Sequence, residues 1–307
     1  MSSAHRVFAL LFPLVLVFGN VHACDDKVDF KAVKGFPTVP SNIQLGRCSG
    51  VDVDKQGNVY LFHRAKDPII CFDSHGHVIR TWGNEVIKNA HGLRIDAEGH
   101  IWVTDLDTHQ VYKYTPKGKL LLTLGKKGEA GLATDQFDKP TDVAFGAKGE
   151  LYVSDGYGNS RVMKFAADGK FLKTWGTPGT NPGEFDTPHT ILVNDLGWVI
   201  VGDRENERVQ VFDPEGVLIN IWSGYKPFGL AFDPTGTIFV ADGKAHQVLQ
   251  LSKGGEVVDR WGKEGTGPGE FKLPHMLASD SQGNLYVAEI LSNRMQKLER
   301  ISGKPSS

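Results

Sequence analysis

The sequence predicts an all-β protein, a six-bladed β-propeller, and three observations carry this prediction. A turn glycine recurs six times, each time between two short β-rich segments. Two more such segments follow, and the last ends in Trp or Leu before glycine, as in TWG, TLG and RWG. No stretch has the apolar period of a long amphipathic helix. Six copies of four strands match a six-bladed ring. The glycines are Gly57, Gly99, Gly149, Gly197, Gly236 and Gly283.

The first 23 residues have the pattern of a signal peptide. An apolar run covers residues 7–18, and Val21-His22-Ala23 resembles a cleavage site. We therefore expect a secreted or periplasmic protein. Cleavage after Ala23 would expose Cys24, so a lipid anchor at Cys24 is an alternative to free secretion. Cys48 and Cys71 either pair in an oxidising compartment or stay as two buried thiols.

The mature chain divides into a leader at 24–42, the propeller at 43–302 and a tail at 303–307. The outer strand of the sixth copy would fall beyond residue 307, so another segment must supply it. Residues 43–46 (IQLG) resemble the fourth-strand ending LTLG. We expect this segment to complete the last blade and close the ring, which would also protect its edge.

Three histidines occupy the same position in alternate copies. His91, His189 and His275 each lie eight residues before the turn glycine of copies two, four and six. The first strand of a propeller blade lines the central channel, so these imidazoles should converge on the axis. Three neutral imidazoles with an open fourth position suit a catalytic Zn²⁺, although Fe²⁺ or Co²⁺ accepts the same ligands. The alternative is three channel histidines bonded to carbonyls and water. The equivalent residues of copies one, three and five are Ser49, Thr141 and Phe228.

Three residues near the second-strand ends depart from the repeat, and such departures favour function. Arg64 and Arg204 carry guanidinium groups that could bind a carboxylate. Tyr157 is a candidate general acid or base. Alternatively, Arg204 belongs to a solvated charged run, Arg64 pairs with a neighbouring acid, and Tyr157 is a wall residue.

Five second strands end in an acid, and such repetition indicates a structural role in the scaffold. We also expect His109 and His246, which share the context HQV, to be structural. The acids are Asp105, Asp155, Asp203, Asp242 and Glu289.

Several of these motifs together resemble the peptidyl-α-hydroxyglycine α-amidating lyases, which are NHL-repeat propellers. The resemblance covers about residues 43–300 and includes SGVDVD, HGLRIDAEGHIWVTD, YVSDGYGNSR, PGEFDTPHTI, GDRENERVQVF and LPHMLASDSQGNLYV. It implies a zinc-dependent lyase that cleaves the C–N bond of an N-acyl- or peptidyl-α-hydroxyglycine and releases an amide and glyoxylate.

The resemblance also implies the role of each site residue. The three histidines would hold zinc, Tyr157 would be the base, and Arg64 and Arg204 would bind the substrate. A structural Ca²⁺ would use the carbonyls of Val51 and Leu93, but Met276 stands where the family has the acid ligand.

Two other functions compete with the lyase. One is a non-catalytic NHL binding module, and the other is a different metal-dependent propeller enzyme acting on a related carbinolamide or ureido-glycolate. The net charge of −2 gives no basic field for nucleic acid. We expect a monomer without a membrane span, whose partner is a small molecule or a peptide ending in α-hydroxyglycine.

Overall fold

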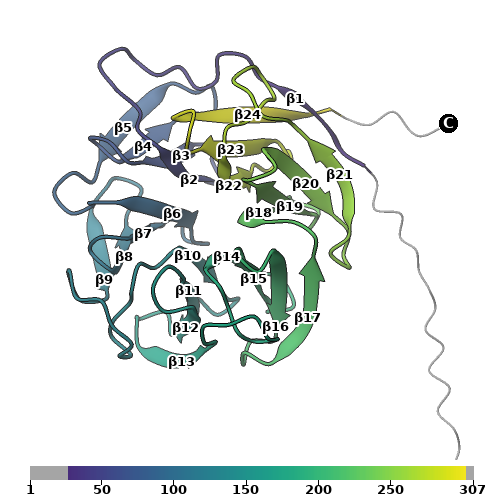
Figure 1. Cartoon of the computed structure of the whole chain (residues 1–307). Helices are drawn as coiled ribbons and strands as arrows, with labels where there is room; N and C mark the ends of the chain where they lie inside the picture. The colour runs from purple at the N-terminus through teal and green to yellow at the C-terminus, as the bar shows by residue number, and fades with distance from the viewer. Residues whose placement is uncertain (1–26, 302–307) are drawn as a thin grey trace, which may run out of the picture.

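The computed structural model describes residues 27–301, which form six four-stranded antiparallel sheets around a central axis (Figure 1). The predicted six-bladed propeller is confirmed. The predicted signal peptide, Cys24 and the tail lie outside the described residues. No helix in the described part of the chain is long and apolar enough to cross a membrane.

Each blade uses four strands, which follow one another from the axis outward. Blade one contains β2 (Cys48–Val53), β3 (Val59–His63), β4 (Ile69–Phe72) and β5 (Val78–Trp82), and blade two contains β6 (Ala90–Ile95), β7 (Ile101–Asp105), β8 (Gln110–Tyr114) and β9 (Leu120–Leu124). Blade three contains β10 (Asp142–Phe145), β11 (Leu151–Asp155), β12 (Arg161–Phe165) and β13 (Phe171–Trp175), and blade four contains β14 (Pro188–Val193), β15 (Val199–Asp203), β16 (Arg208–Phe212) and β17 (Leu218–Ser223). Blade five contains β18 (Pro227–Phe232), β19 (Ile238–Asp242), β20 (Gln247–Leu251) and β21 (Val257–Trp261), and blade six contains β22 (Pro274–Ser279), β23 (Leu285–Glu289), β24 (Arg294–Ile301) and β1 (Asp29–Ala32).

The second strand of every blade is buried along its whole length, whereas the outer strands keep exposed positions. A strand covered on both faces by neighbouring blades needs apolar residues at consecutive positions, which the sequences VYLFH and IWVTD provide. The six turn glycines all adopt a positive φ, as Gly57 does at 82°. This left-handed conformation favours glycine and ends the first strand of each blade.

An N-terminal strand closes the ring, as predicted, but that strand is β1 (Asp29–Ala32). The prediction that residues 43–46 close it was wrong, as was the placement of 29–32 in a leader outside the propeller. Asp29 pairs with Ile301 and Ala32 with Leu298, and Phe30 packs edge-on against Phe239 and Trp261 of blade five. Chain length explains the error. An outer strand lies about 14 Å from an inner strand, three strand spacings away. Two residue steps from Gly46 to Cys48 reach only about 7 Å.

Residues 43–46 instead seal the join between the first and last blades. Ile43 and Leu45 pack against a cluster that includes Val59 and Phe72 of blade one and Tyr286 of blade six. Gly46 donates its N–H to Nδ1 of buried His63. The segment thus links the closing strand to β2.

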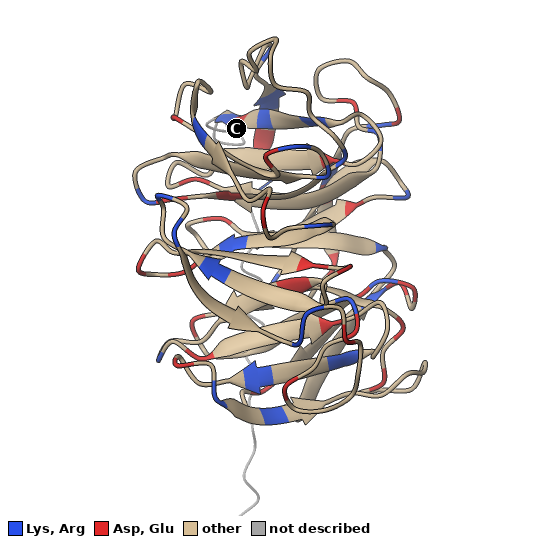
Figure 2. Cartoon of the chain, turned by 90° about the vertical axis from the view of Figure 1, so that its left-hand side faces the viewer, with Lys and Arg blue, Asp and Glu red and all other residues tan. Residues whose placement is uncertain are grey.

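Surface charges of both signs are interspersed around the ring. Figure 2 shows Lys and Arg alternating with Asp and Glu along the strand edges and loops of one side. Cys48 and Cys71 are both buried and unpaired, so two buried thiols are what the structure shows. Burial raises the pKa of each thiol above its usual range.

Candidate metal centre

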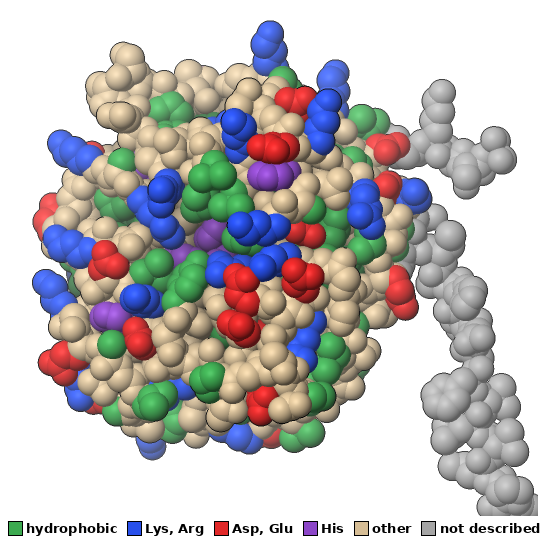
Figure 3. All heavy atoms as spheres, viewed as in Figure 1, with side chains coloured by type: hydrophobic (Ala, Val, Ile, Leu, Met, Phe, Trp, Pro, Cys, Tyr) green, Lys and Arg blue, Asp and Glu red, His purple; other side chains and the backbone are tan. Residues whose placement is uncertain are grey.

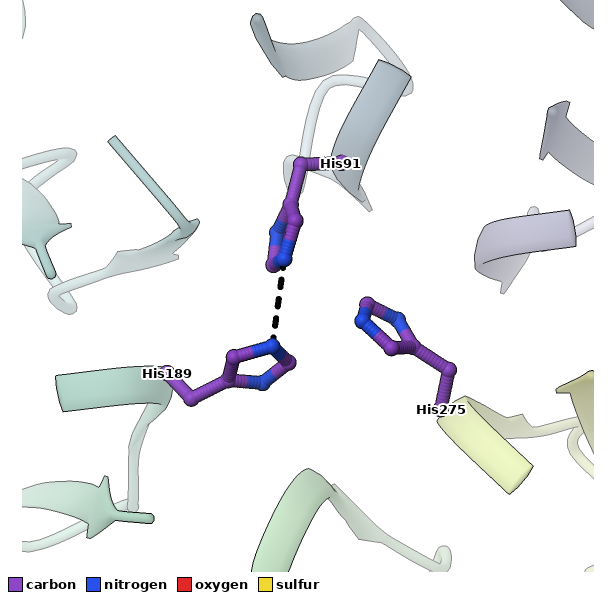
Figure 4. Close-up of side chains that lie close together, drawn as sticks. All are labelled: His91, His189 and His275. Carbon is purple, nitrogen blue, oxygen red and sulfur yellow. Dashed lines mark hydrogen bonds between the residues drawn. The ribbon is translucent and has the colours of Figure 1, made fainter. Parts of the chain in front are cut away.

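The first strands of alternate blades bring the three predicted histidines to one point on the axis. His91 lies on β6, His189 on β14 and His275 on β22, each at the second position of its strand. Figure 4 shows the three imidazoles approaching one another from separate blades. Their ring centroids are 4.6, 4.7 and 4.8 Å apart, which makes a nearly equilateral triangle. The predicted convergence is confirmed.

A backbone carbonyl of the next blade orients each imidazole. Nδ1 of His91 lies 2.7 Å from the carbonyl oxygen of Thr141, Nδ1 of His189 lies 2.6 Å from that of Phe228, and Nδ1 of His275 lies 2.6 Å from that of Ser49. A carbonyl only accepts, so Nδ1 must carry the proton. Each Nε2 therefore presents a lone pair to the axis, which is how an outer hydrogen bond prepares a metal-binding histidine.

The surroundings also keep the three imidazoles neutral. Burial lowers the pKa of His91 and His189 well below the usual value, and the charge of Arg204 lowers both further. Burial lowers the pKa of His275 to about 3. Neutral imidazole is the form that binds metals, so all three are in the binding form at neutral pH.

The nitrogen spacing fits a small divalent cation. Nε2 of His91 lies 3.1 Å from Nε2 of His189, and the three candidate ligand atoms lie within 4.8 Å of one another. Two lone pairs facing each other at this distance repel unless a cation lies between them. Tetrahedral zinc, with Zn–N bonds of about 2.0–2.1 Å, separates its ligand nitrogens by about 3.3 Å. The three residues therefore fit zinc, and Fe²⁺ or Co²⁺ shares these ligand preferences.

Tyr157 and Arg204 lie directly beside this cluster. The Tyr157 hydroxyl lies 3.2 Å from Nε2 of His91 and 3.0 Å from Nε2 of His189. Nη1 of Arg204 donates to the same hydroxyl oxygen over 3.0 Å. Tyr157 is 37% exposed, so its ring is accessible from solvent. Figure 3 shows histidine atoms at the centre of this face, next to hydrophobic and basic side chains.

Arg64 approaches the cluster from blade one. Its Nε donates to the carbonyl oxygen of Ala90, the residue before His91, over 2.9 Å. Burial lowers the pKa of Arg64, and its charge in turn lowers the pKa of His91 and His275. Three candidate ligand nitrogens, the Tyr157 phenol and the Arg204 guanidinium thus lie together, and the Arg64 charge acts on the same histidines.

Comparison with known proteins places this arrangement in a family. The NHL repeat model matches residues 137–165. Peptidyl-α-hydroxyglycine α-amidating lyase 2 of Drosophila melanogaster is 32% identical over 308 residues, which cover 85% of this chain and 72% of the fly protein. The chain belongs to the peptidyl-α-hydroxyglycine α-amidating lyase family.

Other relatives of this lyase family differ in length. The peptidyl-glycine α-amidating monooxygenase of Mus musculus is 31% identical over 82% of this chain, and the chain spans only 30% of the mouse protein. The NHL repeat-containing protein 3 of Mus musculus is 31% identical over 81% of this chain and 78% of its own length. The streptogramin B lyase structure superposes with a TM-score of 0.64, at 13% identity, over 90% of this chain and 98% of that one. This last likeness concerns the fold.

The calcium site that the lyase resemblance implies lacks a suitable donor set. Val51 and Leu93 lie on neighbouring first strands with their side chains in the apolar core. Calcium takes six to eight oxygen ligands, usually including carboxylates. Met276 is fully buried where the acid is expected, and Asp142, at the equivalent position of blade three, is paired with Arg94. Calcium therefore remains a prediction from the resemblance that these residues do not support.

The acids at the second-strand ends are structural, as predicted. Asp155 accepts from the backbone N–H of Asp138 and from Arg161, and Asp203 accepts from the N–H of Asp186 and from Arg208. The remaining three, Asp105, Asp242 and Glu289, also accept backbone N–H groups. His109 and His246 likewise accept the backbone N–H of Lys139 and Leu273.

Sequence reasoning missed two features of this lyase-type centre. The first is the set of carbonyl groups that bond the histidines, which belong to Thr141, Phe228 and Ser49. Because every residue has a backbone carbonyl, the residue types at these positions do not indicate the contact. The other is Arg94, a buried residue on β6 that pairs with Asp142 across blades. An arginine inside an otherwise apolar first strand is the signal that could have indicated it.

Proposed function

We propose that this protein is a zinc-dependent lyase that converts an N-acyl- or peptidyl-α-hydroxyglycine into an amide and glyoxylate. The observation that supports it best is the meeting of three Nε2 atoms with the Tyr157 hydroxyl, 3.0 and 3.2 Å from two of them. The candidate metal ligands and a side chain that can transfer a proton therefore lie together at a place that a substrate can reach from solvent.

Zinc bound by His91, His189 and His275 would supply a Lewis acid that polarises the oxygen atoms of the substrate and makes its hydroxyl more acidic. The histidines hold their orientation without help from the substrate, because each Nδ1 is already bonded to a carbonyl.

Tyr157 would move the proton of the reaction. It would act as the phenolate, whose negative charge Arg204 stabilises, and its oxygen would take the proton of the substrate hydroxyl and become a neutral phenol. The C–O bond becomes the aldehyde of glyoxylate as the C–N bond breaks. The electron pair of the C–N bond stays on nitrogen, which takes up the proton and leaves as the amide. No water is consumed, so the reaction is an elimination.

Arg64 and Arg204 would hold the substrate carboxylate. They approach from blades one and four, which are half a turn apart in the ring. Two guanidinium groups in a partly buried site bind a carboxylate strongly and fix its direction. This arrangement favours a substrate with an acid group next to the reacting carbon.

The test is glyoxylate release from a peptide ending in α-hydroxyglycine, measured with the metal-loaded protein, after chelation and after zinc is restored. We expect activity to disappear with the metal and to return with it. His189→Ala should lose both zinc and activity. Wild-type-like turnover by His189→Ala would refute the proposal, and His75→Ala, which changes an exposed histidine, is the matched control.

The same variants separate the rival functions. A non-catalytic NHL binding protein would bind no stoichiometric metal and would keep its binding in His189→Ala. A lyase acting on another carbinolamide or on ureido-glycolate would keep the metal requirement but prefer that substrate. A calcium-dependent propeller hydrolase needs oxygen ligands on the axis, whereas the described centre offers imidazole nitrogens.

We also propose that the protein is exported and acts as a monomer, either free or anchored through Cys24. The apolar N-terminal sequence supports export. Intact mass and N-terminal sequencing of the secreted protein would show whether cleavage follows Ala23 and whether Cys24 carries lipid.

A further inference from the structure

The six residues that directly follow the second strands differ in kind around the ring. Opposite blades one and four contribute Arg64 and Arg204. The blades on either side of Arg64 contribute Leu106 and Ile290, whereas the blades on either side of Arg204 contribute Gly156 and Gly243. The two arginines therefore have different surroundings.

Both glycines stand where a larger residue would collide with a neighbouring blade. A Cβ on Gly243 would lie 2.7 Å from the ring of Phe228 and 2.9 Å from the carbonyl oxygen of Pro274. A Cβ on Gly156 would lie 2.1 Å from the carbonyl oxygen of Pro188. Gly243 therefore makes room for the Phe228 ring, whereas Gly156 allows the backbone of blade four to approach.

Aromatic rings contact Arg204 from blades three and five. The centre of its guanidinium lies 5.1 Å from the ring centroid of Tyr157 and 4.8 Å from that of Phe228. Both separations are within cation–π range. Glu205 accepts a hydrogen bond from Nε of Arg204 at 2.8 Å. The Arg204 guanidinium is thus held by two aromatic rings and one carboxylate.

Phe228 also contacts the metal centre itself. Its ring centroid lies 5.4 Å from that of His189 and 6.0 Å from that of His275, and the side chain is 5% exposed. The equivalent residues of blades one and three, Ser49 and Thr141, offer the same carbonyl to a histidine but have small polar side chains. The large ring is therefore not needed for the carbonyl contact.

We propose that Phe228 is a positioning residue that holds the Arg204 guanidinium against Tyr157 and so keeps Nη1 on the Tyr157 hydroxyl. This inference rests on the proposed lyase function for its catalytic consequence. Its structural part, the placement of Arg204, is independent of the substrate. Gly243 contributes to the same positioning of Arg204, because a larger residue at 243 would displace the Phe228 ring.

The first test compares Phe228→Leu, which removes the ring, with Phe228→Tyr, which keeps it. Both retain the backbone carbonyl that orients His189. We expect Phe228→Leu to lower kcat/KM by about 10- to 30-fold, the value of a desolvated cation–π contact, at unchanged zinc content. Phe228→Tyr should stay within about twofold of wild type, and Gly243→Ala should resemble Phe228→Leu.

The second test asks whether Phe228 acts through Arg204. In an Arg204→Ala background the change Phe228→Leu should lower kcat/KM by less than about twofold, because the group that it positions is absent. An equal loss in both backgrounds, or a loss of zinc in Phe228→Leu, would show that the ring supports the histidines instead and would overturn the proposal.

A crystal structure of zinc-loaded Phe228→Leu separates this inference from the proposed function. We expect the 3.0 Å contact between Nη1 of Arg204 and the Tyr157 hydroxyl to be lost. Retention of that contact overturns the positioning role whatever the enzyme does. Absence of lyase activity in the wild-type protein would instead refute the proposed function, while the position of Arg204 in the variant would still decide the structural part.

Discussion

Replacing Arg94 with Met should destabilise the ring more than any single surface change. The Arg94 guanidinium binds Asp142 through contacts of 2.7 to 3.3 Å, and it also donates to Thr190 and to the carbonyl oxygens of Leu230 and Leu277. One side chain of blade two thereby contacts blades three, four, five and six. Arg94→Met removes every one of these bonds at once.

The structure sets the size of this effect. The side chains of Arg94 and Asp142 are 8% and 0% exposed, so the substitution leaves the Asp142 carboxylate buried without its partner. Removing one member of a buried ion pair costs about 3–5 kcal/mol. The carbonyl oxygens of Leu230 and Leu277 lose a donor as well, which favours the upper half of that range. For a domain of this size, such a loss lowers Tm by roughly 7–9 °C.

The assay is thermal and urea unfolding of wild type, Arg94→Met and the double variant Arg94→Met/Asp142→Asn. The double variant has no unpaired charge, so we expect it to recover about 2 kcal/mol or more. Lys126→Met, which breaks an exposed pair with Asp135, should leave Tm unchanged. Arg94→Met unfolding at the wild-type temperature would refute the account of a buried, charge-balanced axis.

Burial raises the pKa of the Asp52 carboxyl to about 6 in the folded protein. As pH rises, this carboxyl therefore loses its proton at a lower pH in the unfolded chain than in the folded one. The free energy of unfolding should then fall by about 2 kcal/mol between pH 4 and pH 6. The pH dependence of urea unfolding should lose this component in Asp52→Asn. Tyr157→Phe should keep its zinc and lose about 10²- to 10⁴-fold in kcat; normal turnover would remove Tyr157 as the proton carrier. Phe30→Ala should cost about 2 kcal/mol by loosening the closing strand, whereas Leu45→Ala should cost less; the reverse order in unfolding experiments would contradict the observed closure.

The sequence predicted the fold and the convergence of the three histidines because both depend on which positions of the six repeats are equivalent. The turn glycines define which positions of the six repeats are equivalent. In a six-bladed ring, His91, His189 and His275 then converge on the axis, so no separate prediction of contacts between distant parts of the sequence is needed. Tyr157 and Arg204 were singled out as candidates for the related reason that they interrupt the repeat. The structure places both within hydrogen-bonding distance of each other.

Residues whose role depends on chain connectivity or on backbone groups could not be predicted in this way. The choice between residues 43–46 and Asp29–Ala32 for the closing strand depends on how far two residues can reach, not on how similar IQLG and LTLG look. Phe228 occupies a position equivalent to the histidines, and its sequence suggests only a packing role. Its contact with Arg204 depends on the absence of a side chain at Gly243, which the repeat pattern does not reveal.

The last blade takes strands from both ends of the described chain, and this has a consequence for the order of folding. His275 lies on that blade and bonds the carbonyl of Ser49 on the first blade. The third histidine of the cluster is therefore oriented only after the sixth blade has packed against the first. A chain that lacks blade six cannot assemble the three-histidine cluster, so a metal bound there would report that the ring has closed.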